Sequence, residues 1–355
     1  MSSLDMSGLS SEIVVRIGDL ALGVEIEAEP GETVAIVGPN GAGKSSAVRA
    51  LSGLLPLDAG HIHLGGRALD LPDENVFVPP HQRRIGTAFQ DNLLFPHLRV
   101  RENVTFALKG RQATSNQKAD EWLERLGIAE LGDRRVSELS GGQARRVAIA
   151  RALVAASDLV ILDEPFAGLD VTVRAALRRT LTEHLVDHQA CRIVITHDPA
   201  DAHTLADRMI VIEGGDVVQR GTPDEIRRRP NTAYVADLVG VNLLRGVARD
   251  GQVVIDQGVL TLSIADRTIE GAVRVTIAPH AVALYRDAPE GSPRNTWQAV
   301  VGALHQLGDV VRVYLDTPLP IVADVTLGAV RDLDIAPGHQ LWAAVKATSF
   351  EISPG

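Results

Sequence analysis

Residues 38–45 read Gly-Pro-Asn-Gly-Ala-Gly-Lys-Ser, and the expected fold follows from this stretch. It matches the pattern G-x-x-x-x-G-K-[ST] and lies between the apolar run 33–37 and the helical run 46–54. Glycines let backbone N–H groups curl around phosphate oxygens, and the start of the next helix adds a positive potential. We therefore expect a P-loop, in which Lys44 bridges the terminal phosphates and Ser45 ligates Mg²⁺; the flanking strand and helix argue against a chance glycine-rich turn. The residues expected to hold the nucleotide here are Gly38, Pro39, Asn40, Gly41, Ala42, Gly43, Lys44, Ser45 and Ser46.

Composition and charge narrow the class of protein. The 355 residues suffice for about two domains, and 45% hydrophobic with 23% charged residues suit a globular chain. Asp and Glu number 45 against 35 Lys and Arg, a net charge of −10, so no nucleic-acid partner is expected. The single cysteine, Cys191, excludes an intrachain disulfide and a thiolate metal cluster and favours a reducing compartment. No apolar run is long enough to span a bilayer and no basic, apolar leader is present, so we expect a chain that is neither exported nor membrane-spanning.

The pattern along the chain predicts two domains. Between Glu12 and about Gly240, short apolar runs alternate with helical periodicity, which favours an α/β fold with parallel strands joined by crossover helices. The strand signal fades at residues 91–139, where a helical insertion is expected. After residue 240 apolar and polar residues alternate between Pro- and Gly-rich turns, which indicates a small all-β, OB-like barrel. We therefore expect domains at residues 1–240 and 241–355, and the runs expected to form buried parallel strands are 33–37, 86–89, 159–162 and 192–196.

An acidic pair follows one of these runs. Residues 159–164 read Leu-Val-Ile-Leu-Asp-Glu, and ligands bind at the carboxyl ends of parallel strands. Asp163 is suited to reach Mg²⁺, and Glu164 is the candidate base that polarises the attacking water. Acids at strand ends are usually only solvated caps, but a P-loop on the same sheet favours the functional interpretation.

Residues 139–143 read Leu-Ser-Gly-Gly-Gln, before a helix expected to begin near Ala144. Serine, glycine and a helix start again offer donors to phosphate, so the chain contains a second phosphate-binding element. With the P-loop, the Asp-Glu pair, Gln90 and His197 in this order, residues 12–240 resemble the ATP-binding subunit of ABC transporters. In that family this run is the signature motif. The residues that the resemblance adds to the nucleotide site are Ser140, Gly141, Gly142, Gln143 and Asp170.

The resemblance implies an ATPase that works as a head-to-tail homodimer, in which the signature motif of one copy closes over the γ-phosphate held by the P-loop of the other. Gln90 resembles the residue that senses Mg²⁺ and the attacking water and links the site to the helical insertion. His197 resembles the switch histidine at the γ-phosphate, and Asp170 resembles the loop acid that communicates across the dimer. Without the surrounding motifs, each of these residues would be interpreted as an ordinary surface residue. The implied cofactors are ATP and Mg²⁺, with catalytic roles for Glu164, His197 and Gln90 and metal binding by Ser45, Gln90 and Asp163.

The adenine contact departs from the family pattern. Most of these domains stack the base on an aromatic residue shortly before the P-loop, yet this sequence has no Phe, Trp or Tyr before Phe77. Stacking is worth roughly 1–3 kcal/mol. The departure implies weaker nucleotide binding, or packing of Arg16 or an aliphatic side chain on the base.

A chain without a membrane span that resembles a transporter subunit needs separate permease chains. The resemblance makes it a peripheral protein on the cytoplasmic face of the membrane, with an extracytoplasmic solute-binding protein as a further partner. Residues 92–97, Asn-Leu-Leu-Phe-Pro-His, are the expected socket for the permease, although the same apolar side chains would equally suit the core of the helical insertion.

The tail points to the solute. Residues 292–295, Ser-Pro-Arg-Asn, and 345–349, Val-Lys-Ala-Thr-Ser, resemble the paired motifs of the regulatory MOP/TOBE β-barrel of molybdate-handling proteins. Such donors suit a tetrahedral dianion, so we expect import of an oxyanion, molybdate first. Two alternatives stay open for the tail: it binds molybdate as a regulatory domain, or its polar residues only solvate and pack a structural barrel. Pro293 stands where a small residue is more usual, and related barrels in importers of sulfate, iron, sugars and polyamines keep those solutes as alternatives. A soluble ABC ATPase of DNA repair or translation is disfavoured, because residues 241–355 carry 9 basic against 12 acidic side chains where a nucleic-acid-binding barrel should be basic.

Overall fold

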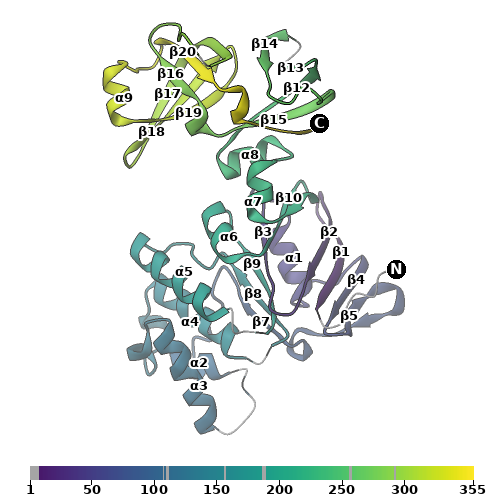
Figure 1. Ribbon diagram of the computed structural model, residues 1–355. Helices are drawn as coiled ribbons and strands as arrows, with labels where there is room; N and C mark the ends of the chain where they lie inside the picture. The colour runs from purple at the N-terminus through teal and green to yellow at the C-terminus, as the bar shows by residue number, and fades with distance from the viewer. Residues whose placement is uncertain are drawn as a thin grey trace. The chain divides into compact units, whose positions relative to one another are not determined.

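The computed structural model describes residues 8–106, 108, 112–155, 157–185, 189–255, 258–291 and 293–355. The chain forms two compact units, Met1–Pro223 and Asp224–Gly355 (Figure 1). The division comes at the start of helix α7 (Pro223–Arg228), and the next helix, α8 (Ala233–Val239), packs against the first strand of the second unit. The boundary expected near residue 240 falls after both helices.

An 11-stranded mixed sheet forms the centre of the first unit. Strands β7, β8, β9, β3 and β10 run parallel, whereas β1, β2, β4, β5 and β6 pair antiparallel. The α/β expectation is confirmed, but the prediction of parallel strands is wrong for the second group. Burial alternates along β1 and β2, as is typical of antiparallel strands with one solvated face. The strands are β1 (Leu9–Ile17), β2 (Leu20–Ala28), β3 (Thr33–Val37), β4 (Ala59–Leu64), β5 (Arg67–Leu71), β6 (Val76–Phe77), β7 (Ile85–Ala88), β8 (Leu159–Asp163), β9 (Cys191–Ile195), β10 (Arg208–Glu213) and β11 (Asp216–Gly221).

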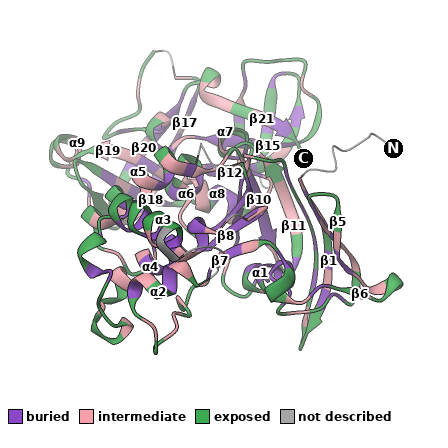
Figure 2. Ribbon diagram, turned by 90° about the horizontal axis from the view of Figure 1, so that it is seen from below, coloured by how far each residue is buried: buried purple, intermediate pink, exposed green. Residues whose placement is uncertain are grey.

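Three neighbouring strands are buried along their whole length. Every residue of β3, β8 and β9 is buried, as the purple strands of Figure 2 illustrate for β8. Continuous apolar runs of this kind belong to parallel strands that are covered on both faces. Their carboxyl ends bring the segments 38–43, 163–164 and 196–197 to one edge of the sheet, where ligands bind in such folds.

Helices α2, α3, α4 and α5 lie together beside β7 and β8 (Figure 1), and their apolar residues share one core with these strands. The helical insertion expected at residues 91–139 contains α2 and α3. Helix α4 begins at Gly141 and not near Ala144, because Ser140 and Gln143 form a capping box: Gln143 N donates to Ser140 Oγ at 3.3 Å, and Ser140 N donates to Gln143 Oε1 at 2.9 Å. The helices of this unit are α1 (Lys44–Leu51), α2 (Val100–Thr105), α3 (Gln112–Arg125), α4 (Gly141–Val154), α5 (Val171–Leu185) and α6 (Pro199–Leu205).

Within the described part of the chain, no helix is both long enough and apolar enough to cross a membrane.

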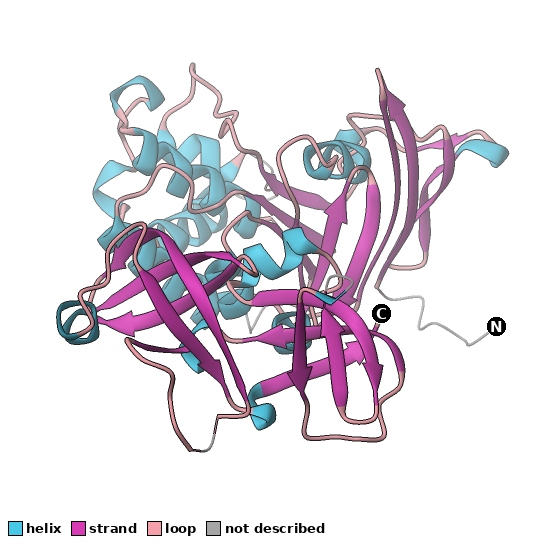
Figure 3. Cartoon of the chain, turned by 90° about the horizontal axis from the view of Figure 1, so that it is seen from above, coloured by secondary structure: helices cyan, strands magenta, loops and turns pink. Residues whose placement is uncertain are grey.

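The second unit consists of two five-stranded antiparallel sheets around one apolar core (Figure 3), so the all-β expectation for the tail is confirmed. Four strands of one sheet lie in the order β14-β13-β12-β15, and four strands of the other repeat this order as β19-β18-β17-β20. The fifth strand of the first sheet is β21, which pairs with β15, and the fifth strand of the second sheet is β16, which pairs with β20. Asn242 Nδ2 donates to Val322 O at 2.9 Å, and Asn295 Nδ2 donates to Ser263 O at 3.0 Å. Each asparagine therefore joins the two sheets. The elements are β12 (Asn242–Arg249), β13 (Gln252–Ile255), β14 (Leu260–Ser263), β15 (Gly271–Ile277), β16 (Ala283–Tyr285), β17 (Asn295–Leu307), β18 (Val310–Thr317), β19 (Ile321–Thr326), α9 (Leu327–Asp332), β20 (Gln340–Val345) and β21 (Phe350–Pro354).

Candidate active site

The P-loop residues connect β3 to α1. Gly43 has φ of 102°, a left-handed conformation that glycine adopts without strain. A Cβ on Gly38 would lie 2.2 Å from the Ile212 carbonyl oxygen, so the loop passes too close to β10 for any side chain there. Lys44 is 8% exposed, and its Nζ donates to the carbonyl oxygens of Gly38 at 2.7 Å and Pro39 at 2.9 Å. The ammonium group is therefore already folded into the loop that would receive the phosphates.

Two acids at the end of β8 face this lysine. Asp163 is 5% exposed, and its burial, with the charge of Glu164 beside it, raises the pKa of Asp163 to about 6. Burial lowers the pKa of Lys44, while the charges of Glu164 and Asp163 act in the opposite direction. The lysine and the two acids thus share one desolvated site. A bound cation would favour the charged form of Asp163.

Glu164 adopts an unusual backbone conformation with φ of 52°, which is costly for any residue other than glycine and concentrates at functional sites. Its backbone N donates to Ile195 O at 2.9 Å, which ties it to the end of β9. His197 follows β9, and its Nδ1 lies 2.9 Å from both carboxylate oxygens of Glu164. The strained turn therefore aims the carboxylate at the histidine.

Gln90 follows β7, and its side chain is exposed. Its backbone oxygen accepts a hydrogen bond from Arg145 Nη2 at 2.6 Å, and Phe89 O accepts one from Arg145 Nη1 at 2.8 Å. Arg145 lies in α4, is 5% exposed and was not singled out by the sequence. Nothing in the sequence distinguishes Arg145 from Arg146 and Arg151, which lie in the same helix.

The signature residues lie at the start of α4. The side chains of Ser140 and Gln143 bond to each other's backbone, while Gly141 and Gly142 form the first turn, whose N–H groups lack intrahelical partners. Asp170 Oδ1 accepts from Val173 N at 3.0 Å at the start of α5. The structure thus unites Lys44, Asp163, Glu164 and His197 in one site and presents the signature residues and Asp170 at helix N-termini.

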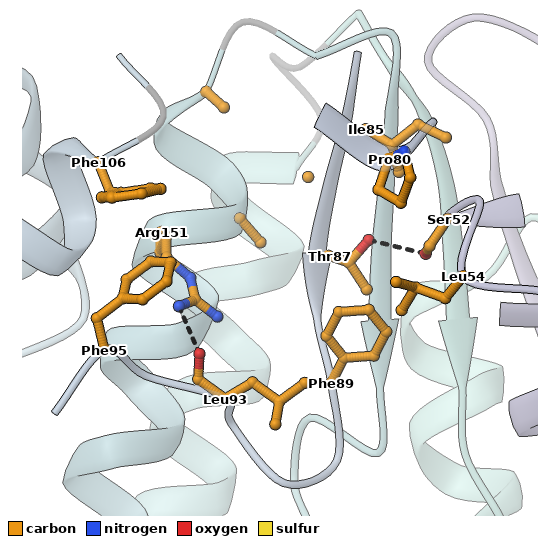
Figure 4. A pocket seen from close by; sticks show the side chains of 13 residues that line it. Ser52, Leu54, Pro80, Ile85, Thr87, Phe89, Leu93, Phe95, Phe106 and Arg151 are labelled. Carbon is orange, nitrogen blue, oxygen red and sulfur yellow. Dashed lines mark hydrogen bonds between the residues drawn. The ribbon is translucent and has the colours of Figure 1, made fainter. Parts of the chain in front are cut away.

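An apolar pocket of about 380 Å³ lies beside the loop that follows Gln90 (Figure 4). Leu93, Phe95 and Phe106 line it, and Leu93 and Phe106 are 55% and 60% exposed. Arg151 Nη1 donates to Leu93 O at 2.8 Å, and the Arg151 guanidinium lies 5.4 Å from the centre of the Phe95 ring. Two residues of the expected socket therefore line this pocket.

In the second unit, the described residues of the two motifs expected to bind an oxyanion lie at neighbouring ends of two paired strands, the start of β17 and the end of β20. Asn295 lies opposite Val345, so Arg294 and Lys346, both exposed, lie at neighbouring strand ends. The Asn295 amide is engaged between the two sheets, where Ser263 N donates to its Oδ1 at 2.6 Å. Ser292 lies outside the described residues.

Known proteins resemble both parts of the chain. A family model described as ABC transporter matches residues 22–167, and a TOBE domain model matches residues 291–351. The chain is 38% identical to a molybdenum import ATP-binding protein of Mycobacterium tuberculosis over 98% of each chain. It is 33% identical to a sulfate/thiosulfate import ATP-binding protein of Agrobacterium fabrum, over 90% of this chain and 89% of the relative. It is 37% identical to an Fe(3+) ions import ATP-binding protein of Streptomyces avermitilis, over 78% and 79%.

Among solved structures, the dimeric structure of an ATP-binding cassette in a post-hydrolysis state with ADP and Pi matches with a TM-score of 0.53 and 27% identity, over 61% of this chain and 98% of that one. The matched 61% of this chain is about as long as the first unit. The 38% identity to a molybdenum import ATP-binding protein extends over 98% of both chains, and the residues matched by the ABC transporter model include the P-loop and the acidic pair of this chain. The chain therefore belongs to the ABC transporter ATP-binding family and is an ABC-type ATPase.

Proposed function

We propose that the chain is the ATP-hydrolysing subunit that powers import of an oxyanion, molybdate, through a separate membrane permease. The observation that carries this proposal is the similarity to a molybdenum import ATP-binding protein over 98% of both chains, because it includes the tail as well as the ATPase part. The similarity to the sulfate/thiosulfate and Fe(3+) import proteins extends over 89% and 79% of those chains. Sulfate and iron are therefore the solutes that a test must separate from molybdate.

The nucleotide is held in this proposal by the P-loop, with Lys44 at the terminal phosphates. Ser45, Gln90 and Asp163 offer hydroxyl, amide and carboxylate oxygens, which are the hard donors that Mg²⁺ prefers. The buried Asp163 fits this role, because a cation beside it stabilises the carboxylate that burial disfavours. Mg²⁺ would supply charge neutralisation at the phosphates.

Glu164 is the proposed general base, and His197 is the residue that meets the γ-phosphate. In the structure the two side chains bond to each other, with the histidine 68% and the glutamate 14% exposed. The exposed imidazole is the freer partner, so nucleotide would draw His197 away from Glu164. A carboxylate oxygen then becomes available to accept a proton from the attacking water.

A second copy of the chain completes the site in this proposal. The N–H groups of Gly141 and Gly142, with Ser140 and Gln143 beside them, would reach the γ-phosphate held by the partner's P-loop, since a helix N-terminus favours an anion. Asp170, exposed at the start of α5, would contact the partner copy. The dimeric cassette among the solved relatives supports this arrangement.

The permease would dock at the pocket lined by Leu93, Phe95 and Phe106. Its apolar lining suits a short amphipathic helix, and the loop on its rim leads directly to Gln90. The proposal makes the chain a peripheral protein on the cytoplasmic face of the membrane, which receives solute from an extracytoplasmic binding protein.

The adenine contact falls to an aliphatic side chain. Ile17 is 40% exposed at the end of β1, and Leu20, which begins β2 across the same turn, lies 3.6 Å from a Cβ position on Gly43. This turn therefore borders the P-loop. We assign the packing against the adenine ring to Ile17.

The tail would bind the transported oxyanion as a regulator. Arg294 and Lys346 supply two exposed cations at neighbouring strand ends, and Thr348 adds an exposed hydroxyl. Charge-assisted hydrogen bonds of this kind suit a tetrahedral dianion.

Uptake of labelled molybdate by cells that depend on this chain tests the proposal. Cells with the wild-type chain should accumulate molybdate, and cells with Glu164→Gln should not, while sulfate and iron uptake should be the same in both. Molybdate uptake that survives Glu164→Gln, with sulfate or iron uptake lost instead, would contradict molybdate as the solute.

A further inference from the structure

The loop at residues 89–93 joins the nucleotide site to the apolar pocket, and two arginines of α4 bind its backbone. Arg145 Nη1 and Nη2 donate to Phe89 O at 2.8 Å and Gln90 O at 2.6 Å. Six residues later, Arg151 Nη2 and Nη1 donate to Asn92 O at 2.9 Å and Leu93 O at 2.8 Å, the latter drawn in Figure 4. Four carbonyl groups of one short loop are thus bound by guanidinium groups of the helix that begins with the signature motif.

This loop is strained where it meets the pocket. Asn92 and Leu93 have φ of 59° and 43°, left-handed values that are uncommon for asparagine and a true outlier for leucine. The Asn92 Oδ1 atom is buried without a hydrogen-bond partner, so the loop is not stabilised by its own side chain. Conformations of this kind persist only where the surroundings enforce them. Here backbone hydrogen bonds within the loop, from Asn92 N and Leu93 N, are joined by the guanidinium contacts from α4.

Arg145 is unlike an ordinary surface arginine. It is 5% exposed, and its Nη1 also lies 3.4 Å from Asp163 O, so one guanidinium touches the backbone on both sides of the nucleotide site. Burial lowers the pKa of Arg145, while the nearby charges of Asp163, Glu164 and Asp91 oppose this effect. The planar guanidinium of arginine holds its N–H donors in a fixed fork, whereas a lysine ammonium is a point charge on a flexible stem and a glutamine amide has only two N–H donors.

We propose that Arg145 is a positioning residue for ATP hydrolysis, which sets Gln90 relative to Asp163 by binding the backbone of both segments, with Arg151 as the second point of the clamp at the pocket. This inference rests on the proposed role of Gln90 at the metal and the attacking water. Because both arginines belong to α4, the loop and the signature helix then move as one body. Displacement at the pocket is passed to Gln90 and to the signature motif together.

The test compares three variants of the full chain. Arg145→Gln removes the fork, Arg145→Lys keeps the charge, and Arg146→Gln is the matched control. Arg146 neighbours Arg145 on the same helix and likewise donates to carbonyl groups, of Leu126 at 3.1 Å and Gly127 at 3.2 Å, but it does not contact the loop.

The first readout is amide hydrogen exchange in the loop without nucleotide. Asn92 N donates to Phe89 O at 2.9 Å and Leu93 N to Asp91 O at 2.6 Å, so these two amides report the loop conformation. Arg145→Gln should accelerate their exchange, and Arg146→Gln should leave it at the wild-type rate. Equal exchange in the wild type and Arg145→Gln would overturn the clamp.

The second readout is the rate of ATP hydrolysis as a function of ATP and Mg²⁺. We expect Arg145→Gln to lower kcat about ten- to hundredfold and to raise the Mg²⁺ concentration needed, with KM for ATP little changed, and Arg145→Lys to recover part of kcat. Arg146→Gln should keep the wild-type kcat. Equal kcat for Arg145→Gln and Arg146→Gln would overturn the positioning role. A wild-type chain that hydrolyses no ATP would contradict the proposed function, whereas the clamp would still be decided by hydrogen exchange.

Discussion

At the scale of single residues, Glu164 makes the most direct prediction. Its carboxylate is the proposed base, and Glu164→Gln keeps the shape of the side chain while removing its ability to accept a proton. We expect turnover to fall by about 10²- to 10⁴-fold with ATP affinity retained. Phosphate release and equilibrium binding of ATP, measured on the same preparation, check this. Wild-type turnover in the variant would remove Glu164 from the role of base.

Asp163 predicts a pH dependence of stability. Its pKa in the folded chain is raised from 3.8 to about 6, so between these values the folded state keeps a proton that the unfolded state releases. The contribution of this group to the free energy of unfolding is therefore present at low pH and is lost as pH rises through about 6, a decline of about 3 kcal/mol. Asp163→Asn should remove the decline.

Urea unfolding without Mg²⁺, from about pH 4 to about pH 8, measures this difference. The variant should gain stability over the wild type as pH rises to about 6 and keep a constant advantage above it. Parallel curves for the two proteins would contradict the assignment of a desolvated, uncompensated carboxylate.

Ile17 makes a prediction about nucleotide affinity. A stacked aromatic is worth roughly 1–3 kcal/mol per base, which an isoleucine supplies only in part. Ile17→Tyr should therefore tighten ATP binding by about tenfold, whereas Val247→Tyr, at a residue that is 57% exposed in the other unit, should not. Fluorescence titration measures the affinity of each variant for ATP. Unchanged affinity of Ile17→Tyr would mean that adenine packs against a different residue.

At the scale of elements, the strongest sequence predictions were the continuous apolar runs. The run 159–162 appears as β8 (Leu159–Asp163), because a strand buried on both faces needs apolar residues throughout. The start of α4 was placed too late, near Ala144, whereas Ser140 and Gln143 cap a helix that already includes Gly141 and Gly142. The antiparallel pairing of β1 and β2 is that of a local hairpin, in which the turn Gly18-Asp19 joins the two strands, and this hairpin signal was not used in the sequence analysis.

The packing of β7 on α4 gives a prediction at this scale. A Cβ on Gly86 would lie 2.1 Å from Ala152 O, a backbone atom that cannot move aside without shifting the helix. Gly86→Ala should therefore cost about 1–3 kcal/mol of stability. Gly23→Ala is the matched control in β2, because its nearest atom, Asp216 Oδ1, is 3.7 Å away. Denaturant unfolding compares the two, and equal stability would mean that strand and helix are less closely packed than the structure has them.

At the scale of the whole molecule, the motifs place Lys44, Asp163 and His197 at the ends of separate strand runs, and the fold explains why the three residues lie close together. Lys44, Asp163 and His197 each follow a buried strand, so parallel strands in one sheet bring them together. Arg145 could not be found in this way, because its partners are backbone oxygens on a distant loop, and backbone contacts leave no pattern in the sequence. The division after Pro223 could not be predicted from the sequence either, because the helical pattern of the first unit continues through α7 and α8.

In the proposed mechanism, ATP joins two copies of this chain around shared sites, each built from one P-loop and one signature motif. Light scattering on Glu164→Gln, which should bind ATP without turnover, tests it most directly. We expect twice the chain mass of 37.9 kDa with ATP and Mg²⁺, and the mass of one chain with ADP. A single-chain mass under conditions in which ATP is shown to be bound would contradict it.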